Sequence, residues 1–349
     1  MFRESSIFEA EQQLIWENDW VFVTNEASIA EPGDQLPVMI GNQPVLLLRA
    51  QDGELVAVSN LCAHRGTLLV DEATNAKRIQ CPYHAWTYTD GGRLLSVPFS
   101  PKDEIDKAAH CLPTYRVESW HGLIFVSLNA SVEQLTARFA AVDALVAERG
   151  IDELHHWGGH EDEEWQCNWK LAALNAMESY HLFQVHPETL EPFTPTKDAY
   201  YLAGSARATA TGGASLGDDA YLLFSLPPGF VGVLTPSSLL WLTALSLAVD
   251  RCVIRSGGAF PSPAPDATGN RLSKWLTQAA TAASTLAMPD FLPEDKAICE
   301  RGQRGAVGDF SPGLLLDVER IVADFGHYLN WRLNDVEPPP VHVERAATS

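Results

Sequence analysis

The sequence predicts an α+β protein in two parts, an all-β unit followed by a domain that mixes helices with a long β region. Three observations support this prediction. Short β runs separated by turn residues extend from Gln35 to Asn129, helical apolar patterns follow, and β runs return between Tyr200 and Phe260. The chain has 349 residues, 46% hydrophobic and 20% charged, so it suits two globular domains with ample cores.

The first part begins with an amphipathic helix expected at residues 8–20, and its β runs are then joined by turn residues. The order along the chain is LPVMI, Gly41-Asn42, PVLLLRA, Asp52-Gly53, ELVAVS, and later Asp90-Gly91-Gly92 before RLLSV. Gly, Asn and Asp at such points are typical of hairpins. WHGLIFVSLN, from Trp120 to Asn129, is expected to be the last strand of this unit.

The second part is expected to begin with a helix that starts at a capping box on Ser131 and stops near Gly150. A second helix is predicted from the apolar pattern of Leu171, Leu174, Ala176 and Met177, which extends up to Tyr180. Within the later β region, Phe230–Val249 is better explained by two buried strands than by a membrane span, because it contains Pro and Ser residues. Further helices are predicted at about 271–287, 294–304 and 314–334, and the tail from Pro338 is expected to be extended.

The overall charge excludes some classes of partner. At a formal charge of −21 the chain lacks the basic stripe that nucleic acids and anionic membranes require. The first twenty residues carry charges where a signal peptide would have its apolar run, so we expect a cytoplasmic protein. Its six scattered cysteines then favour free thiols or metal ligands over disulfides.

A first candidate metal site comes from two short motifs in the β unit. Cys62 and His64 lie in CAHRG, and Cys81 and His84 lie in CPYHAW, with sixteen residues between the two pairs. Each motif supplies one thiolate and one imidazole, which suits a [2Fe–2S] cluster held by two Cys on one iron and two His on the other. Zinc sites more often group Cys with Cys. A zinc site and four unrelated core residues remain the alternatives.

A second candidate site lies in WQCNWKLAALNAMESYHLFQVHPETL. Glu178 and His181 are expected one turn apart on one helix face, and His186 follows five residues later. Both histidines can meet one ion only if the helix loosens near Val185, for which Pro187 gives a reason. Two imidazoles with a distant carboxylate form the facial arrangement of non-haem Fe(II) oxygenases. Polar side chains unrelated to any metal are the alternative reading of such a pair.

Together the two motifs resemble those of the Rieske non-haem iron oxygenases, in their catalytic alpha subunit, and the resemblance runs from about Trp16 to Trp331. It implies an N-terminal Rieske all-β domain and a C-terminal helix-grip domain, an antiparallel sheet flanked by helices. The expected divisions are a segment 1–34 packing with the catalytic domain, a Rieske domain 35–135 and a catalytic domain 136–349. Thr67 and Tyr83 stand where the Rieske proteins of respiratory complexes carry an extra disulfide, and Ala85 replaces the family's usual Gly.

The resemblance also implies roles for individual residues. Cys62 and Cys81 would bind one cluster iron and His64 and His84 the other, while His181 and His186 would bind the mononuclear iron. PEDKAICERGQRG is similar to the family's Glu-Asp…Glu-x-x-Gln stretch, which makes Asp295 the third ligand. A helix-start acid without a metal, or Asp317 as the ligand, are the competing interpretations.

Two more residues match family positions close to the iron. Glu178 resembles the carboxylate that bridges a cluster histidine of one subunit to an iron histidine of its neighbour, which would orient both rings. Asn175 matches a position near the iron, whereas Leu174 stands where the family often has an acid. A solvated glutamate on a helix face is the alternative for Glu178.

These features lead to an expected function. The chain would be the terminal oxygenase of a multicomponent system, a homotrimer using O₂ and electrons from NAD(P)H through a separate reductase or ferredoxin. Its substrate would be a small organic molecule, an aromatic acid or a quaternary amine, which it hydroxylates or demethylates. The alternatives are ring cis-dihydroxylation, a Rieske electron carrier with an inert C-terminal domain, and a binding protein with zinc at both sites.

Overall fold

The computed structural model describes residues 1–101, 105–214, 220–261, 291–308 and 313–343. The chain forms two compact units, one made of Met1–Phe8 with Thr136–Ser349 and the other of Glu9–Leu135. We call them the catalytic unit and the cluster unit, and each is described by itself. The predicted α+β class is confirmed, because the cluster unit is nearly all β and the catalytic unit combines helices with one large sheet.

The cluster unit contains a seven-stranded antiparallel sheet in the order β1-β10-β9-β4-β3-β2-β5 and a three-stranded sheet, β6-β7-β8. Its strands are β1 (Val21–Asn25), β2 (Asp34–Ile40), β3 (Gln43–Arg49), β4 (Leu55–Ser59), β5 (Thr74–Asn75), β6 (Ile79–Gln80), β7 (Thr87–Tyr88), β8 (Leu94–Ser96), β9 (Thr114–Trp120) and β10 (Leu123–Ser127). The hairpin expected at Gly41-Asn42 is present, since β2 pairs with β3 up to Ile40 and Gln43.

The strand expected from Trp120 to Asn129 is divided in the structure. β9 ends at Trp120 and β10 begins at Leu123, with His121 and Gly122 at φ 49° and 78° in the turn between them. Two successive left-handed residues are the geometry of a type I′ hairpin turn, which Gly adopts readily and His only rarely. The unusual His at the first position hid this turn from the sequence.

The catalytic unit is built on an eight-stranded sheet in the order β11-β17-β16-β15-β14-β13-β12-β18, with every pair antiparallel. The strands are β11 (His156–Trp165), β12 (Tyr200–Gly204), β13 (Thr209–Ala214), β14 (Ala220–Leu226), β15 (Phe230–Thr235), β16 (Ser238–Ala248), β17 (Arg251–Phe260) and β18 (His342–Val343). The segment Phe230–Val249 therefore forms two strands, as expected. Within β16, buried Leu239, Trp241 and Thr243 alternate with less buried neighbours.

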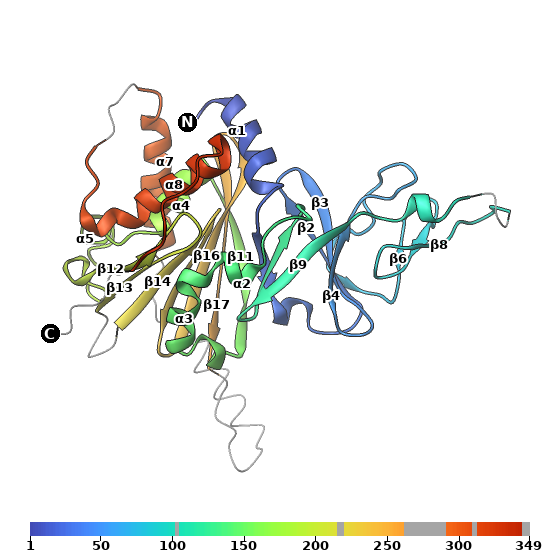
Figure 1. The fold of residues 1–349 in the computed structure, drawn as a ribbon, viewed down its shortest axis with the longest axis horizontal. Coiled ribbons are helices and arrows are strands. Elements are labelled where there is room, and N and C mark those ends of the chain that lie inside the picture. Colours follow the sequence, from blue (N-terminus) through green and yellow to red (C-terminus); the bar gives the residue numbers. More distant parts are fainter. Residues whose placement is uncertain (102–104, 215–219, 262–290, 309–312, 344–349) are drawn as a thin grey trace, which may run out of the picture. The chain divides into compact units, whose positions relative to one another are not determined.

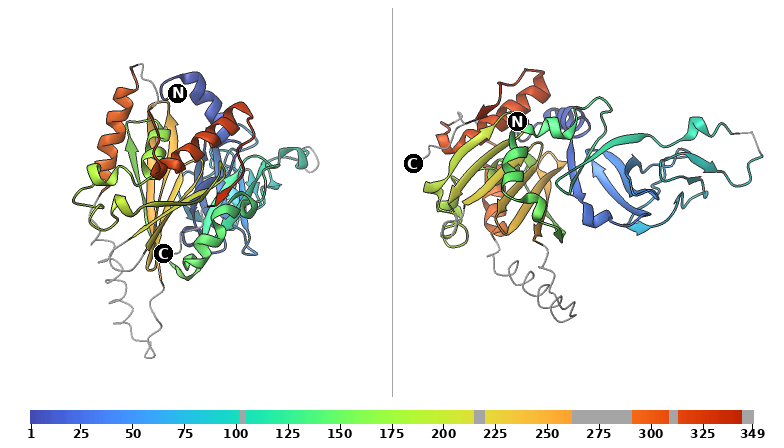
Figure 2. Two further views of the ribbon diagram at one scale, coloured as in Figure 1. Left: turned by 60° about the vertical axis from the view of Figure 1, so that its left-hand side comes forward. Right: turned by 60° about the horizontal axis from the view of Figure 1, so that its bottom comes forward.

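The helices of the catalytic unit are α2 (Leu135–Arg138), α3 (Ala140–Glu148), α4 (Trp169–Ala176), α5 (Leu182–Val185), α7 (Leu292–Gly305) and α8 (Arg320–Asn334). α4 packs on β15, β16 and β17, and α8 packs on β12 and β13 (Figures 1 and 2). α7 packs on α4 and contacts α5. The segments that carry the second histidine motif and the Asp295 stretch therefore meet beside the sheet.

Several predicted helix boundaries are wrong. The capping box at Ser131 does not form: Asn129 accepts a hydrogen bond from Ser131 N, and the helix begins only at Leu135, whose N–H donates to Glu118 Oε2 over 2.9 Å. A carboxylate from a distant strand thus does the capping, which local sequence cannot reveal. The helix predicted for 314–334 begins at Arg320, and Leu314 before it is 87% exposed. The helix predicted for 271–287 lies outside the described residues.

The N-terminal segment also differs from the expectation for residues 1–34. Only Met1–Phe8 clusters with the catalytic unit, and the chain from Glu9 onward belongs to the cluster unit. The physical reason is the pairing of β1 with β10, which makes Val21–Asn25 part of the cluster unit's sheet. Helix α1 (Ser5–Glu11) and a π-helical turn (Gln12–Trp16) replace the single helix predicted for residues 8–20. In the part of the chain that the structure describes, no helix is long and apolar enough to cross a membrane.

Candidate metal centres

The first candidate centre lies at two tight loops of the cluster unit. Cys62 O accepts from Gly66 N over 2.8 Å, and Cys81 O accepts from Ala85 N over 3.0 Å, so each motif closes on its own cysteine. Gly66 and Ala85 both have left-handed backbones, with φ of 69° and 55°. Such a turn costs a glycine nothing but strains an alanine, so the loop at Ala85 stores strain that the loop at Gly66 avoids.

These loops bring together the four side chains that the sequence singled out. Cys62 and Cys81 are buried in the hydrophobic core of the unit, 3% and 2% exposed. The rings of His64 and His84 lie with their centroids 4.7 Å apart, and the Nδ1 atoms of both are buried without a hydrogen-bond partner among the described residues. Buried polar nitrogens normally have partners, so two of them side by side fit ligation of a metal group. This donor set, two thiols and two imidazoles, suits a Rieske cluster.

Two aromatic residues line this centre. Tyr88 O–H lies 3.3 Å from Cys62 Sγ and accepts a hydrogen bond from Ala63 N over 3.2 Å, which leaves the hydroxyl proton free to be donated to the sulfur. Burial, followed by the contact with Cys62, raises the pKa of Tyr88, so the phenol stays protonated. Trp86 stacks on His64 with 4.9 Å between the ring centroids. The aromatic packing covers one face of the His64 ring.

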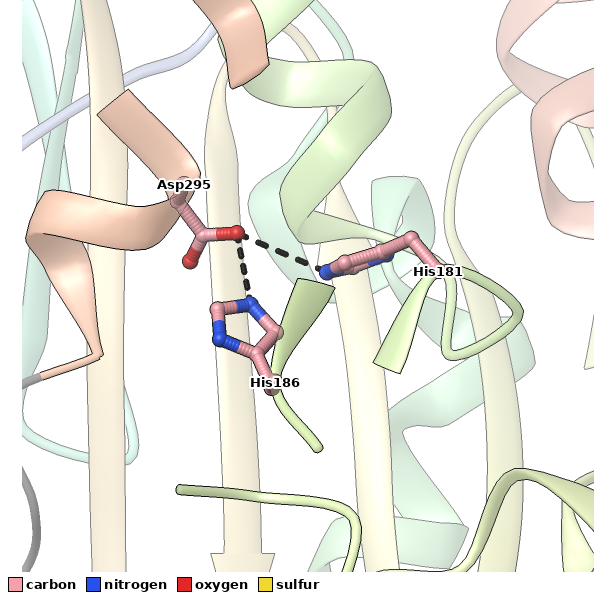
Figure 3. A group of neighbouring side chains, drawn as sticks. All are labelled: His181, His186 and Asp295. Carbon is pink, nitrogen blue, oxygen red and sulfur yellow. Dashed lines mark hydrogen bonds and ion pairs between the residues drawn. The ribbon is translucent and has the colours of Figure 1, made fainter. Parts of the chain in front are cut away.

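The second candidate centre forms where α5 and α7 meet. Asp295 Oδ1 lies 2.9 Å from His186 Nε2 and 3.5 Å from His181 Nε2. Figure 3 shows this single carboxylate oxygen facing both rings, with Asp295 extending from α7 and the histidines from the loops on either side of α5. Among the described residues these three form the group whose ligand atoms all lie within 4.8 Å of one another. Asp317, the competing acid, is exposed and not part of this group.

The local structure explains how the two histidines meet. The predicted continuous helix to Tyr180 is wrong, because α4 ends at Ala176 and His181 precedes the short helix α5. The chain therefore turns before His181, and α5 stops again at Val185, one residue before His186 and two before Pro187. Two breaks rather than one bring the rings to 5.2 Å between centroids. On the other side, Pro293 near the start of α7 leaves Asp295 in the first helical turn.

Each histidine of this candidate centre is paired with its own carboxylate. Glu178 Oε1 pairs with His181 Nδ1 over 2.6 Å, and Glu294 Oε2 pairs with His186 Nδ1 over 2.6 Å. Thr189 Oγ1 also donates to Glu294 Oε2, over 2.6 Å. An acceptor on Nδ1 fixes the tautomer that leaves Nε2 available for a metal. Sequence reasoning missed Glu294 and Thr189 as partners of His186; the only available signal was the adjacency of Glu294 to Asp295.

Asn175 lies beside Asp295, the carboxylate of this candidate centre. Its Nδ2 donates to Asp295 Oδ1 over 2.6 Å, so this predicted residue lies beside the carboxylate rather than beside a histidine. Burial alone would raise the pKa of Asp295, but hydrogen bonds from His181, His186 and Asn175 lower it to about 2. Burial alone would lower the pKa of His181, but hydrogen bonds to Asp295 and Glu178 raise it to about 9. The carboxylate is thus held ionised between two basic rings, as a cation site requires.

Comparison with known proteins identifies the family. Residues 19–116 match the Rieske [2Fe-2S] domain, and residues 151–335, more than half of the chain, match the ring hydroxylating alpha subunit (catalytic domain). The chain belongs to the ring-hydroxylating alpha-subunit family. This membership agrees with both centres: the cysteine–histidine loops lie inside the first match and the His181 group inside the second.

Two curated relatives show the range of this alpha-subunit family. The large subunit of anthranilate 1,2-dioxygenase from Acinetobacter baylyi is 34% identical over 194 residues, covering 53% of this chain and 41% of that protein. The oxygenase subunit of glycine betaine monooxygenase from Chromohalobacter salexigens is 33% identical over 190 residues, covering 54% and 42%. The chain thus matches less than half of the length of these relatives. A naphthalene 1,2-dioxygenase structure from Rhodococcus sp. has a TM-score of 0.80 at 19% identity, covers 96% of this chain and 94% of its own, and shares the fold.

Proposed function

We propose that this alpha subunit is the terminal oxygenase of a multicomponent system that hydroxylates or demethylates a small organic substrate. The cluster unit holds a [2Fe–2S] cluster through Cys62, Cys81, His64 and His84, and the catalytic unit holds Fe(II) through His181, His186 and Asp295. The observation that carries the proposal is the meeting of two Nε2 atoms and one carboxylate oxygen within 4.8 Å. When bound, the ferrous ion supplies positions for O₂ beside the substrate, and the cluster supplies electrons.

The protein's own groups have separate tasks in this proposal. Asp295 provides the one anionic ligand, and its low pKa keeps it ionised throughout the physiological range. Glu178 and Glu294 hold the Nδ1 protons of the two histidines, so both rings present Nε2 to the same point. Three protein ligands on one face leave the opposite face of an ion open. An electron carrier with an inert C-terminal unit, or a zinc-binding protein, has no need of such an open face beside a Rieske motif.

The proposed substrate is an aromatic acid or a quaternary amine. One curated relative is named for anthranilate and another for glycine betaine, at 34% identity over 53% of this chain and 33% identity over 54% of it. Ring cis-dihydroxylation is the second candidate reaction, because the anthranilate relative is named a 1,2-dioxygenase. The two reactions differ in the product, which keeps both oxygen atoms of O₂ in the second case.

The proposed assembly accounts for the presence of the two proposed metal centres in different units of the chain. We propose a separate NAD(P)H reductase or ferredoxin as electron donor, and a head-to-tail homotrimer in which Glu178 connects His181 to a cluster histidine of the neighbouring subunit. A closed heterologous ring is the symmetry that such a contact generates. We also propose a cytoplasmic location, with which six cysteines that form no disulfide agree.

The proposal is tested with purified protein reconstituted with both metals, a surrogate reductase and a panel of aromatic acids and quaternary amines. Product formation is scored against NADH consumption, and His186→Ala serves as the comparison. Product that depends on His186 with at least one panel member supports the proposal. A protein that retains a Rieske spectrum but binds no Fe(II) at His181 and His186 would contradict it and favour the electron carrier.

A further inference from the structure

α7 packs on α4 (Figure 1). A ladder of hydrogen bonds joins α7 to the segment that leads into and through α4. It has four rungs: Asn175 Nδ2 to Asp295 Oδ1 (2.6 Å), Cys299 Sγ to Leu171 O (3.7 Å), Asn168 N to Gln303 Oε1 (2.9 Å) and Gln166 N to Glu300 Oε1 (3.0 Å). Along the first three rungs, residue numbers fall from Asn175 to Asn168 as they rise from Asp295 to Gln303, and the fourth rung, from Gln166 to Glu300, departs from this order. The ladder therefore fixes the position of α7 along α4 and its rotation about its own axis.

Of the four hydrogen bonds, the one between Asn168 and Gln303 is the hardest for another group to replace. Asn168 is fully buried, and its side chain is already in use: Oδ1 accepts from Lys170 N over 3.0 Å at the start of α4, and Nδ2 donates to Val249 O over 2.7 Å. Its backbone N–H lies before the first helical turn, and it donates to Gln303 Oε1. Removing the Gln303 amide leaves a buried donor without this partner, which favours displacement of α7.

Gln303 also reaches the start of the chain. Its Nε2 donates to Phe2 O over 3.2 Å, and the Phe2 ring lies 5.6 Å from Lys170 Nζ on α4. The segment Met1–Phe8 belongs to the catalytic unit, although the residues that follow it do not. One amide therefore connects three separate parts of the sequence: the N-terminal segment, the start of α4 and α7.

The opposite end of the ladder is the metal group. Asp295 lies eight residues before Gln303 on α7, a separation of about 12 Å along a helix axis. Asp295 and Cys299 are the buried residues of α7, so both face the same side as the ladder. A shift of α7 at Gln303 moves Asp295 relative to His181 and His186, because the two helical turns between Gln303 and Asp295 transmit displacement as a rigid body. Metal ligands tolerate little displacement before affinity falls.

We propose that Gln303 is a positioning residue for the Asp295 carboxylate, and that the N-terminal segment at Phe2 is part of the same scaffold. The inference rests on the proposed function, since it requires a ferrous site at His181, His186 and Asp295. It assigns a task to the Glu-x-x-Gln part of the stretch, Glu300 and Gln303, which lies two helical turns away from the metal.

The test compares three variants of the cluster-loaded protein. Gln303→Leu removes both hydrogen bonds of the amide, whereas Gln303→Glu keeps an oxygen for Asn168 N and loses the donor to Phe2. Tyr201→Phe is the stability control: it removes a 2.7 Å hydrogen bond to Asp324 that anchors α8 rather than α7. Fe(II) affinity is measured by anaerobic competition with a chelator, the Fe(II)–nitric oxide EPR signal reports ligand geometry, and the Rieske EPR signal is the internal reference.

The expected result for Gln303→Leu is Fe(II) affinity lower by about tenfold or more and an altered nitrosyl signal, with the Rieske signal unchanged. The Fe(II) affinity of Gln303→Glu should lie between the affinities of Gln303→Leu and the wild type. Tyr201→Phe should be less thermally stable than the wild type, but its Fe(II) affinity should differ by less than twofold. Wild-type affinity in Gln303→Leu overturns the proposal. If that variant does not fold, Glu300→Ala removes the adjacent rung and is judged by the same criterion. Failure of the wild type to bind Fe(II) through His181 and His186 would instead overturn the proposed function.

Discussion

Oδ1 of Asp295 lies 2.9 Å from Nε2 of His186, although the two residues are 109 positions apart in the sequence. The other groups of the site are arranged around this contact. Nδ1 of His186 is held by Glu294, the residue immediately before Asp295, so one helical turn supplies both the ligand and the orienting acid. α7 therefore controls the geometry of the ferrous site that we propose.

Replacing Glu294 by Gln should weaken metal binding. Gln lacks the negative charge that stabilises the Nδ1–H tautomer of His186, and the affinity for Fe(II) should fall by about tenfold. The measurement is an anaerobic chelator competition at fixed pH. Glu188→Gln is the matched control, because Glu188 is exposed and lies only two residues from His186. Equal affinities in the two variants would show that Glu294 has no orienting task.

Metal affinity should also rise with pH. Burial alone would lower the pKa of His181, but its hydrogen bonds to Asp295 and Glu178 raise it to about 9 in the metal-free protein. At pH 7 His181 therefore holds a proton that the metal must displace, and affinity should increase about tenfold per pH unit for each proton released. Co(II), which stays soluble over this range, is the probe between pH 6 and 8. An affinity independent of pH in that window contradicts the assignment of the ligand.

Replacing Ala85 by Gly should stabilise the cluster unit. Ala85 has a left-handed backbone with φ of 55°, a conformation that costs an alanine but not a glycine. The free energy of unfolding should rise by about 1 kcal/mol, which corresponds to a rise of about 2–4 °C in the temperature midpoint of unfolding. Ala147→Gly, at an exposed position in α3, is the control and should lower stability by about 0.5–1 kcal/mol. A loss of stability in both variants would mean that the Cβ of Ala85 is needed where it is.

Replacing Glu178 by Gln separates metal binding from turnover. With Fe(II) in excess both metals should remain bound, because Glu178 ligates neither, but loss of the negative charge between His181 and the neighbouring subunit should stop coupled turnover. Iron and sulfide analysis with the two EPR signals checks the first expectation, and product per NADH checks the second. Turnover at the wild-type rate would remove the bridging role from Glu178.

The parts of the fold that the sequence predicted well are those in which burial alone determines the pattern. The paired strands of Phe230–Val249 and the hairpin at Gly41-Asn42 are examples. Boundaries set by tertiary contacts were predicted poorly: Glu118 caps α2 from a distant strand, and β11 was missed because Gly158-Gly159 and an acidic run interrupt its apolar pattern.

The candidate site divides in the same way. Residues in short motifs, such as His181 and His186, were found because spacing along the chain restricts the chemistry. Glu294 and Gln303 were not singled out, because each acts on a partner far away in the sequence. A glutamate at a helix start and a glutamine near a helix end have common structural explanations, so only the folded chain distinguishes them from ordinary surface residues.

A single-turnover experiment tests the central claim most directly. Protein with both metals is reduced, freed of excess reductant and mixed with O₂ and a substrate identified in the panel, and the Rieske spectrum and the product are followed together. The account predicts that cluster oxidation and product appear at the same rate, and that both are lost in His186→Ala. Oxidation of the cluster without product, or product that persists without His186, would contradict it.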